Sequence, residues 1–413
     1  MFLPRRVVLL AALLLALAFG SMPMVLAAES APLLLRHPSL SQTAIAFRYA
    51  DDIWTVGRNG GEAQRLTSGG QVNDGPYYSP DGSMIAYSAR PHGTSTVFVI
   101  PAGGGVPRRT TWHPADSFPT GWTPDGKDVL FSSMMVSNRH YFRIFKAHAD
   151  GSGSPEALPL PNAYEGTYSP DGQSFTYEPI TRWEEGWKRY YGGQNFPIWI
   201  VNLKTLDLEK IPSNNTTDTH PVWVGDSIYF LSNRKNADTG APAEIGGGMG
   251  AGVPQTGPVS LFRYDVKTKA VTPVGSNTGF DLKDVQTGPG GLVYEQFGSL
   301  HLVDLASPDQ PGADHTIQVT IHGDLPNLAP HLASISADEI QNAALSPTGQ
   351  RVVLEAHGDI FTVPAEKGDT RNLTNTSNAA ERSPAWSPDG KKIAYFSDAS
   401  GEYQLFLDRK SVV

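Results

Sequence analysis

The stretch YYSPDGSMIAYSAR, residues 77–90, contains a four-residue phrase that returns along the chain. The phrase occurs as SPDG at 79–82, TPDG at 123–126, SPDG at 169–172, SPTG at 346–349 and SPDG at 387–390. The first residues 79, 123 and 169 are 44 and 46 residues apart, and 346 and 387 are 41 residues apart. Self-similarity at such a period indicates a fold built from one supersecondary unit per copy.

The residue types of the phrase predict a tight turn. Proline sets φ near −65° at the second position, aspartate is tolerated at the third, and glycine accepts the left-handed conformation at the fourth. A Ser or Thr at the first position can hydrogen-bond back onto the turn. We therefore interpret the phrase as a hairpin between consecutive strands and do not expect Ser79, Asp81 or Asp171 to be catalytic.

Each copy is followed by segments that are typical of β-strands. The next segment is apolar or alternating and rich in β-branched and aromatic residues, as in SMIAYSAR, KDVLFSSM and KKIAYFSD. A second strand follows, as in TVFVIPA, and a polar turn leads to a third, as in PRRTTW. A repeat of roughly 40–45 residues with four strands is the signature of a β-propeller blade.

Counting the weaker copies predicts the organisation of the chain. HPSLS at 37–41, WVGD at 223–226 and GPGG at 288–291 occupy the gaps, so blades start near 37, 79, 123, 169, 223 and 288, then near 346 and 387. We predict an all-β protein with a six-bladed β-propeller at 29–325, a connector at 326–342 and the first, incomplete blades of a second propeller at 343–413. A single eight-bladed ring is the alternative.

Residues 1–28 differ from the rest of the sequence. MFLPRR supplies positive charge, VVLLAALLLALAFG is apolar, and small residues follow up to Ala27 and Ala28. This pattern predicts a signal peptide and an exported protein, periplasmic or extracellular in a bacterium. A membrane anchor is the alternative, although the apolar run is short for a full span.

Composition excludes several kinds of chemistry. The chain has no cysteine, so disulfides, thiol catalysis and cysteine-bound metal are absent. The net charge is −9 and no basic run exceeds two residues, so we expect no nucleic-acid partner. There is no G-x-S-x-G elbow and no H-E-x-x-H motif. We assign no catalytic, cofactor-binding or metal-binding residue, nothing calls for a cofactor, and we expect His113, His220 and His331 to be structural or solvent-facing.

The stretch TRWEEGWKRYYGGQNFPIWIVNL, residues 181–203, interrupts the repeat with aromatic and basic side chains. Such a mixture suits a binding face, because aromatic rings contribute area and cations can engage a carboxylate. Trp183, Trp187, Lys188 and Arg189 are therefore candidate peptide contacts, unless the aromatic residues simply pack between blades. We interpret the glycine-rich segment 234–257 as an exposed loop, since it has no phosphate-binding motif.

Several segments resemble a known family. The repeat resembles the TolB-type, WD40-like PD40 repeat, and four pieces resemble the N-terminal region of the tricorn protease and its bacterial homologues, which are S41-type serine peptidases. These pieces are DDIWTV (51–56), WKRYYGGQNFPIWIV (187–201), HPVWVGDSIYFLSNR (220–234) and LASISADEIQNAALSPTGQ (332–350).

The resemblance implies a six-bladed propeller, then a seven-bladed one, then PDZ and serine-peptidase domains. It implies large homo-oligomers, typically hexamers, that cut oligopeptides and use the propellers as gated channels. The catalytic residues of the family lie in the C-terminal region, so none is carried over to this chain. The basic pair that the family has near the third hairpin of its first propeller has no counterpart in TWHPADSFPTGWTPDG, and Arg108 and Arg109 precede it.

These expectations combine into one hypothesis. The chain would be the exported N-terminal propeller part of a tricorn-like serine protease, a substrate gate and scaffold that is inactive without a catalytic domain. Its partners would be peptide or protein substrates and other copies of itself, with no membrane contact after signal cleavage. One alternative is a periplasmic TolB-like protein-binding propeller without catalysis. Another is a propeller that caps an α/β-hydrolase, as in the prolyl oligopeptidase class.

Overall fold

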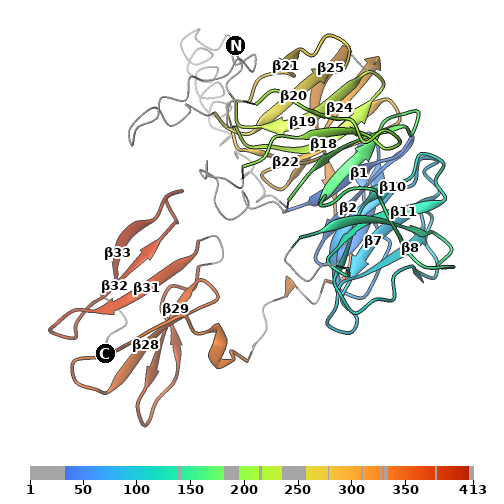
Figure 1. The fold of residues 1–413 in the computed structure, drawn as a ribbon. Coiled ribbons are helices and arrows are strands. Elements are labelled where there is room, and N and C mark those ends of the chain that lie inside the picture. Colours follow the sequence, from blue (N-terminus) through green and yellow to red (C-terminus); the bar gives the residue numbers. More distant parts are fainter. Residues whose placement is uncertain are drawn as a thin grey trace, which may run out of the picture. The chain divides into compact units, whose positions relative to one another are not determined.

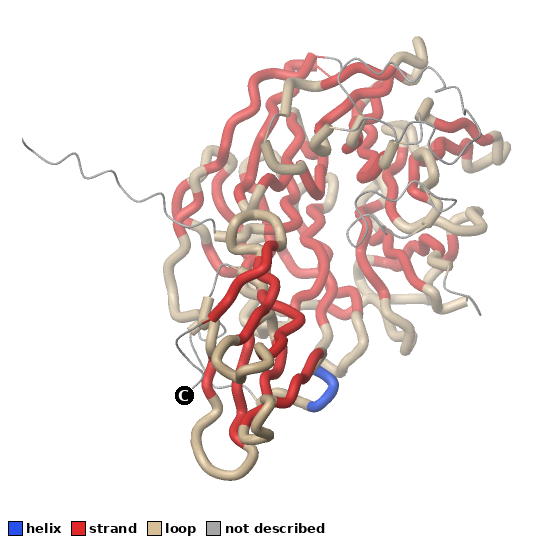
Figure 2. The backbone as a smooth tube through the Cα atoms, turned by 90° about the vertical axis from the view of Figure 1, so that its left-hand side faces the viewer, coloured by secondary structure: helices blue, strands red, loops and turns tan. Residues whose placement is uncertain are grey.

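The computed structural model describes residues 33–136, 141–180, 195–213, 216–234, 257–277, 279–307, 310–325, 328–329, 334–376 and 379–408. The chain divides into two compact units, Met1–Leu328 and Ala329–Val413. Regular structure in the described ranges is almost entirely β, apart from a 3₁₀ turn, η2, at Ala337–Glu339 (Figure 2). None of the helices in these ranges is long and apolar enough to cross a membrane. The predicted signal peptide, residues 1–28, lies outside them.

The described part of the first unit contains six four-stranded antiparallel sheets. Within each sheet the strands are arranged in sequence order, although β4 lies between β3 and β5 in the chain and pairs with β26 instead (Figure 1). In chain order they are β1 (Arg36–Leu40), β2 (Ala44–Tyr49), β3 (Asp52–Gly57) and β5 (Gln64–Arg65); β6 (Val72–Tyr78), β7 (Met84–Ala89), β8 (Thr96–Pro101) and β9 (Arg108–Arg109); β10 (Ser117–Trp122), β11 (Asp128–Ser133), β12 (Arg143–His148) and β13 (Glu156–Ala157); β14 (Glu165–Tyr168), β15 (Ser174–Glu178), β16 (Trp199–Asn202) and β17 (Leu208–Lys210); β18 (Asp218–Val224), β19 (Ser227–Ser232), β20 (Ser260–Asp265) and β21 (Val271–Pro273); and β22 (Leu282–Gly288), β23 (Gly291–Gln296), β24 (Ser299–Ser307) and β25 (Gln310–Ile317).

The first strand of each sheet faces the first strands of its neighbours. Contacts run from β1 to β6, β10, β14, β18 and β22 in turn, and β22 contacts β1 again. The sheets are therefore consistent with propeller blades around a common axis, with their first strands innermost. The all-β prediction is confirmed.

The repeated phrase forms the hairpin between the first and second strands, as predicted. Ser79 Oγ donates to Asp81 Oδ1 at 2.6 Å and accepts from the Met84 N–H at 3.0 Å. Gly82 has φ 72° and donates its N–H to the Ser79 carbonyl at 2.8 Å. The Ser79 hydrogen bond is the main cause that lowers the pKa of Asp81 to about 2. Hydroxyl and carboxylate are thus engaged in the turn, and the same pair recurs at Ser169 and Asp171.

The core lies between the sheets. Each larger hydrophobic cluster combines buried residues of two neighbouring sheets, for example Ile53 of β3 with Ile85 and Ile100 of β7 and β8. Inner strands are buried on both sides, which explains why the second-strand segments of the sequence read as short apolar runs.

Three kinds of contact join the sixth sheet to the first. A cluster of buried residues spans both sheets, with Phe47 and Trp54 on one side and Leu300 and Leu302 on the other. Strand β26 (Val319–Thr320) pairs in parallel with β4 (Gly61–Glu62). Arg58 donates to the carbonyls of Pro289 at 2.6 Å and Gly290 at 3.0 Å, and contacts Asp304 at 3.2 Å. The ring of contacts is therefore closed by packing, backbone pairing and charge.

The second unit contains a four-stranded and a three-stranded antiparallel sheet. Their strands are β27 (Asn342–Leu345), β28 (Arg351–Ala356), β29 (Asp359–Pro364) and β30 (Arg371–Asn372), then β31 (Glu381–Trp386), β32 (Ile393–Ser397) and β33 (Gln404–Asp408). Val353, Ile360 and Ile393 form a small core between the sheets. Leu405 and Leu407 of β33 are 64% and 55% exposed, so the outer side of the second sheet has an apolar face in contact with solvent.

We expect Arg58→Ala to lower the free energy of unfolding of the first unit by ~1–3 kcal/mol, because two carbonyls lose a charged donor. Urea denaturation monitored by tryptophan fluorescence measures the change. Lys127→Ala is the control, since Lys127 is 79% exposed and its ion pair is with the exposed Asp125 at 3.6 Å. An effect no larger for Arg58→Ala than for Lys127→Ala would contradict this role of Arg58 in closure.

We also expect limited proteolysis to cut the chain first near the start of the second unit, within the exposed residues 334–336 that precede η2. Extended, solvent-exposed backbone fits a protease active site, whereas paired strands do not. Mass spectrometry of the products should give a protected N-terminal fragment that contains all six sheets of the first unit. A first cut within a strand of those sheets would contradict the expectation.

Candidate functional site

A central cavity of about 420 Å³ lies where the first strands begin. Its walls come from five of the six first strands of the first unit, β1, β6, β10, β14 and β22. Charged residues of both signs line it, among them Arg36, Asp74, Glu165, Lys283 and Glu295. A second cavity of about 210 Å³ adjoins it along β22 and is lined by β18. We call the end of the ring at which the first strands begin the mouth.

Bulges in the first strands turn polar side chains toward the cavities. The antiparallel register shifts at His37, His220 and Asp284, whose φ angles are 49°, 55° and 51°. The left-handed conformation costs a residue with a side chain roughly 1–2 kcal/mol, and such strain tends to be kept where it serves function. Both histidines precede a proline, but a third His-Pro dipeptide at 113–114 lies between β9 and β10, so the dipeptide alone would not identify the bulges.

Asp284 connects three first strands. Its Oδ1 lies 3.1 Å from His220 Nε2, and its Oδ2 lies 3.5 Å from His37 Nδ1. His37 Nδ1 is also 3.9 Å from Asp74 Oδ1 on β6. The carboxylate of Asp284 is therefore positioned to fix the orientation of both imidazoles at the mouth.

Glu295 has a strongly perturbed acidity. Burial, with a contribution from the Asp284 carboxylate, raises the pKa of Glu295 to about 7, while Arg36, Lys283 and Arg48 act in the opposite direction. Ionisable groups with a strongly shifted pKa that lie in a cavity are candidates for a functional role. Here the group sits at the end of β23, beside the cavity at the mouth.

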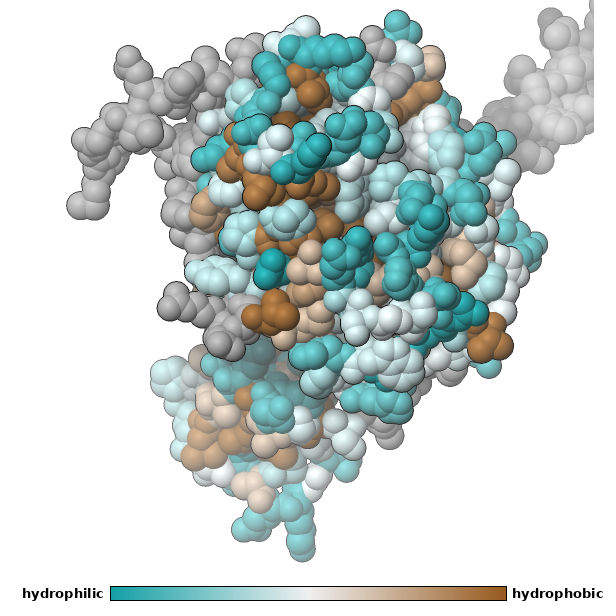
Figure 3. Space-filling view, turned by 45° about the vertical axis from the view of Figure 1, so that its right-hand side comes forward, coloured by the Kyte–Doolittle hydropathy of each residue, from teal (hydrophilic) through white to brown (hydrophobic). Residues whose placement is uncertain are grey.

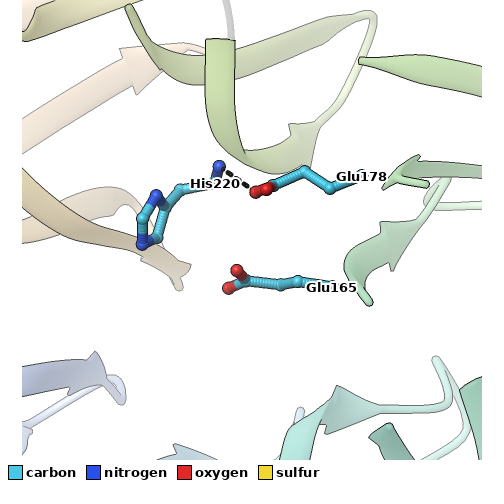
Figure 4. A group of neighbouring side chains, drawn as sticks. All are labelled: Glu165, Glu178 and His220. Carbon is cyan, nitrogen blue, oxygen red and sulfur yellow. Dashed lines mark hydrogen bonds between the residues drawn. The ribbon is translucent and has the colours of Figure 1, made fainter. Parts of the chain in front are cut away.

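Glu165, Glu178 and His220 form a second buried group (Figure 4). Their ligand atoms lie within 4.8 Å of one another, and the residues are 4%, 6% and 6% exposed. The backbone N–H of His220 donates a hydrogen bond to Glu178 Oε1 at 2.6 Å. Two carboxylates and an imidazole are the side chains that bind divalent metals such as Zn²⁺.

The sequence did not bring these residues together. Glu165 and Glu178 lie on β14 and β15, and His220 lies on β18 of the next sheet, within the strand and not at its end. We expected His220 to be structural or solvent-facing; it is buried beside two carboxylates.

The candidate peptide contacts Trp183, Trp187, Lys188 and Arg189 lie outside the described residues, as does His331. These assignments remain predictions. His113 is exposed and accepts the Ala115 N–H at 3.0 Å, which agrees with a structural role.

Large apolar side chains are exposed around the mouth. On the face drawn in Figure 3, apolar patches are separated by hydrophilic residues. Segments that precede a first strand or follow a second strand lie at this end, and they carry Leu34, Trp112, Val136, Tyr141, Phe196, Phe280 and Phe297 in exposed positions. Phe280 and Phe297 stack with ring centroids 4.0 Å apart. Arg109 lies over the Trp112 ring, 4.5 Å from its centroid. The mouth therefore combines charge with aromatic surface.

Comparison with known proteins places this architecture. Residues 32–309 match the family model of the tricorn protease N-terminal β-propeller domain. The chain belongs to this family. The match covers the six sheets up to β24 and therefore includes both cavities.

Similar proteins extend over most of the chain. Tricorn protease homolog 1 of Streptomyces coelicolor is 26% identical over 383 residues, which cover 91% of this chain and 33% of that protein. The tricorn protease homolog of Saccharolobus solfataricus is 21% identical over 362 residues, covering 86% and 31%. The crystal structure of the tricorn protease superposes with a TM-score of 0.55 at 16% identity, over 91% of this chain and 43% of that one. The chain thus spans about a third of the length of these curated relatives.

We expect Glu295→Gln to make the first unit more stable relative to the unchanged chain as pH rises from about 4.5 to about 7. The folded state binds the Glu295 proton more tightly than the unfolded state, so the stability from the protonated form is complete at low pH and is lost across this window. The difference should reach on the order of 3 kcal/mol or less. Denaturation at a series of pH values measures it, with the exposed Glu62→Gln as control. A pH-independent difference would contradict the raised pKa.

Proposed function

We propose that this chain is the exported N-terminal propeller part of a tricorn-like serine protease that acts on oligopeptides. In this proposal it serves as a substrate gate and scaffold, and hydrolysis depends on a catalytic domain elsewhere in the protein. The observation that carries the proposal is the central cavity, which is lined by first strands of a closed ring of sheets in a tricorn-family propeller.

The composition of the mouth supports peptide passage. Lys283 and Arg36 are exposed at the cavity, and Asp74 and Glu165 line the same cavity, so both the positive and negative groups of a peptide find complementary charge. The stacked Phe280 ring lies on the segment just before β22, which carries Lys283. Exposed aromatic surface beside charge is typical of recognition sites for peptides of mixed sequence.

We further propose that residues 29–325 form a complete six-bladed propeller, that 326–342 connect it to the next domain, and that 343–413 begin a second propeller. The contact between β1 and β22 supports six blades over a single eight-bladed ring. The division of the chain after Leu328 supports a connector in this region.

Export and assembly complete the proposal. The charged and apolar pattern of residues 1–28 supports a cleaved signal and a periplasmic or extracellular location. The family resemblance supports a homo-oligomer of the full-length protein, in line with the hexamers of tricorn proteases. Sequencing of the mature N-terminus and light scattering of the full-length protein test these two statements.

Peptide binding tests the gate directly. Fluorescence anisotropy of labelled oligopeptides should show saturable binding to the purified chain, weakened about 5-fold or more by Lys283→Glu, because a rim cation at the mouth becomes an anion. Lys127→Glu makes the same charge change at a hairpin on the opposite end of the ring and should leave binding unchanged. Equal effects of the two variants would place the peptide elsewhere. Binding of folded proteins without any peptide binding would favour the TolB-like protein-binding alternative.

A further inference from the structure

Three exposed apolar side chains lie together at the mouth. Leu34 precedes β1, Phe280 precedes β22, and Phe297 lies in the turn between β23 and β24; they are 58%, 59% and 54% exposed. The two phenyl rings stack with centroids 4.0 Å apart and planes 9° apart. Leu34 adjoins this turn, because the Leu35 N–H donates to the Gly298 carbonyl at 2.9 Å and a side-chain carbon on Gly298 would lie 3.1 Å from Leu34 Cδ2. We call Leu34, Phe280 and Phe297 the rim patch.

Two residues of the rim patch have a backbone conformation that disfavours their side chains. The φ angle is 57° at Leu34 and 48° at Phe297, in the left-handed region that a Cβ atom destabilises. Phe297 and Gly298 are the two residues of the hairpin loop between β23 and β24, and both have positive φ. Asn-Gly is the favoured pair in such a loop. The turn therefore gives no reason for a phenylalanine, and strain of this kind tends to be kept where it serves function.

Hydrogen bonds hold the rim patch in place. The Phe280 carbonyl accepts from Asn277 Nδ2 at 2.8 Å and from Gln296 Nε2 at 2.7 Å. Gln296 is the last residue of β23, so its side chain joins the segment before β22 to the turn that carries Phe297. A surface that is already ordered loses little conformational freedom when a partner binds. Aromatic side chains on such surfaces commonly contribute most of the binding energy.

The charge beside the rim patch is positive. Arg36 and Lys283 lie two and three residues beyond the patch residues of their segments, are exposed, and line the central cavity. The residue opposite Arg36 across β1 and β2 is Arg48, a second cation. Lys283 faces Glu295, but burial raises the pKa of Glu295 to about 7, so this carboxyl neutralises the lysine only in part near neutral pH. Asp281 uses its Oδ1 to accept a backbone N–H at 2.9 Å.

We propose that the rim patch binds an oligopeptide segment in which an aromatic side chain is flanked by acidic side chains. This inference rests on the proposed peptide gate and deepens it, since it names the class of substrate that the mouth selects. The aromatic side chain would pack on the rim patch, and the acidic side chains would pair with Arg36 and Lys283. Two cations on two strands can each take a carboxylate, so an acidic segment fits them better than the single carboxylate of a chain terminus.

Binding of labelled peptides to the purified chain tests the class of ligand. The peptides contain Glu-Phe-Glu, Glu-Ala-Glu or Lys-Phe-Lys between glycines and have an amidated C-terminus, which removes the terminal carboxylate. Fluorescence anisotropy should show that the Glu-Phe-Glu peptide binds at least ~10-fold more tightly than the Glu-Ala-Glu peptide, because the alanine buries much less apolar surface. The Lys-Phe-Lys peptide should also bind more weakly, because its charges repel Arg36 and Lys283.

Phe297→Asn separates binding from folding. It should weaken binding of the Glu-Phe-Glu peptide at least ~10-fold, because half of the aromatic stack is lost. The urea midpoint of the first unit should stay the same or rise, since asparagine tolerates the left-handed conformation better than phenylalanine. Leu206→Asn is the matched control: Leu206 is also 54% exposed, has φ 63°, and lies in the turn between β16 and β17 at the opposite end of the ring. It should leave binding unchanged.

Several results would overturn the proposal. Equal affinity for the Glu-Phe-Glu and Glu-Ala-Glu peptides would exclude the rim patch but leave the peptide gate intact, provided that Lys283→Glu still weakens both. Tighter binding of a Gly-Phe-Gly peptide with a free C-terminal carboxylate would assign the cations to a chain terminus instead. A lower urea midpoint of Phe297→Asn with unchanged affinity would show that the stack only supports the turn. If none of the peptides binds, both the rim patch and the gate fail.

Discussion

The contact between the first and the sixth sheet is the constraint on which the rest of the first unit depends. A row of sheets leaves an apolar face and unpaired strand edges at each end, and both are costly in water. Packing of Trp54 against Leu302, the parallel pair β4 and β26, and the donors of Arg58 remove both ends at once. Without this closure the five other interfaces would remain, but the first strands would no longer surround a common axis.

Closure also decides where the polar groups go. Six first strands that converge on one axis leave little room for side chains, and each bulge moves one residue out of the regular alternation. His37, His220 and Asp284 accept a left-handed backbone at these points and meet at the mouth. Burial in this region raises the pKa of Glu295, and the neighbouring Asp284 carboxylate adds to this effect.

The repeat and its turns could be predicted from the sequence because their physics is local. The residues of SPDG determine a turn within four positions, and the segments that follow have the composition of strands. The sequence was therefore enough to predict six sheets in the first unit and the first sheets of the second. The site could not be predicted, because His220 meets Glu165 only through packing of one sheet on the next. The His-Pro dipeptides at 37 and 220 do not identify the bulges by themselves, since the same dipeptide at 113 lies between β9 and β10. The role of Trp183, Trp187, Lys188 and Arg189 remains a prediction.

A repeat protein allows its repeats to be compared with one another. Such a comparison shows differences between individual side chains that overall sequence identity does not show. The match of residues 32–309 to the tricorn protease N-terminal propeller establishes the family but does not say which side chains of the ring do chemistry. The same scaffold position carries Asn342 opposite Glu355, Lys283 opposite Glu295 and Glu165 opposite Glu178. The backbone register from the pair to the turn is regular on β14 and β27, whereas β22 has a bulge directly after Lys283. An amide, an ammonium group and a carboxylate at this position therefore impose three different charge balances on the glutamate opposite.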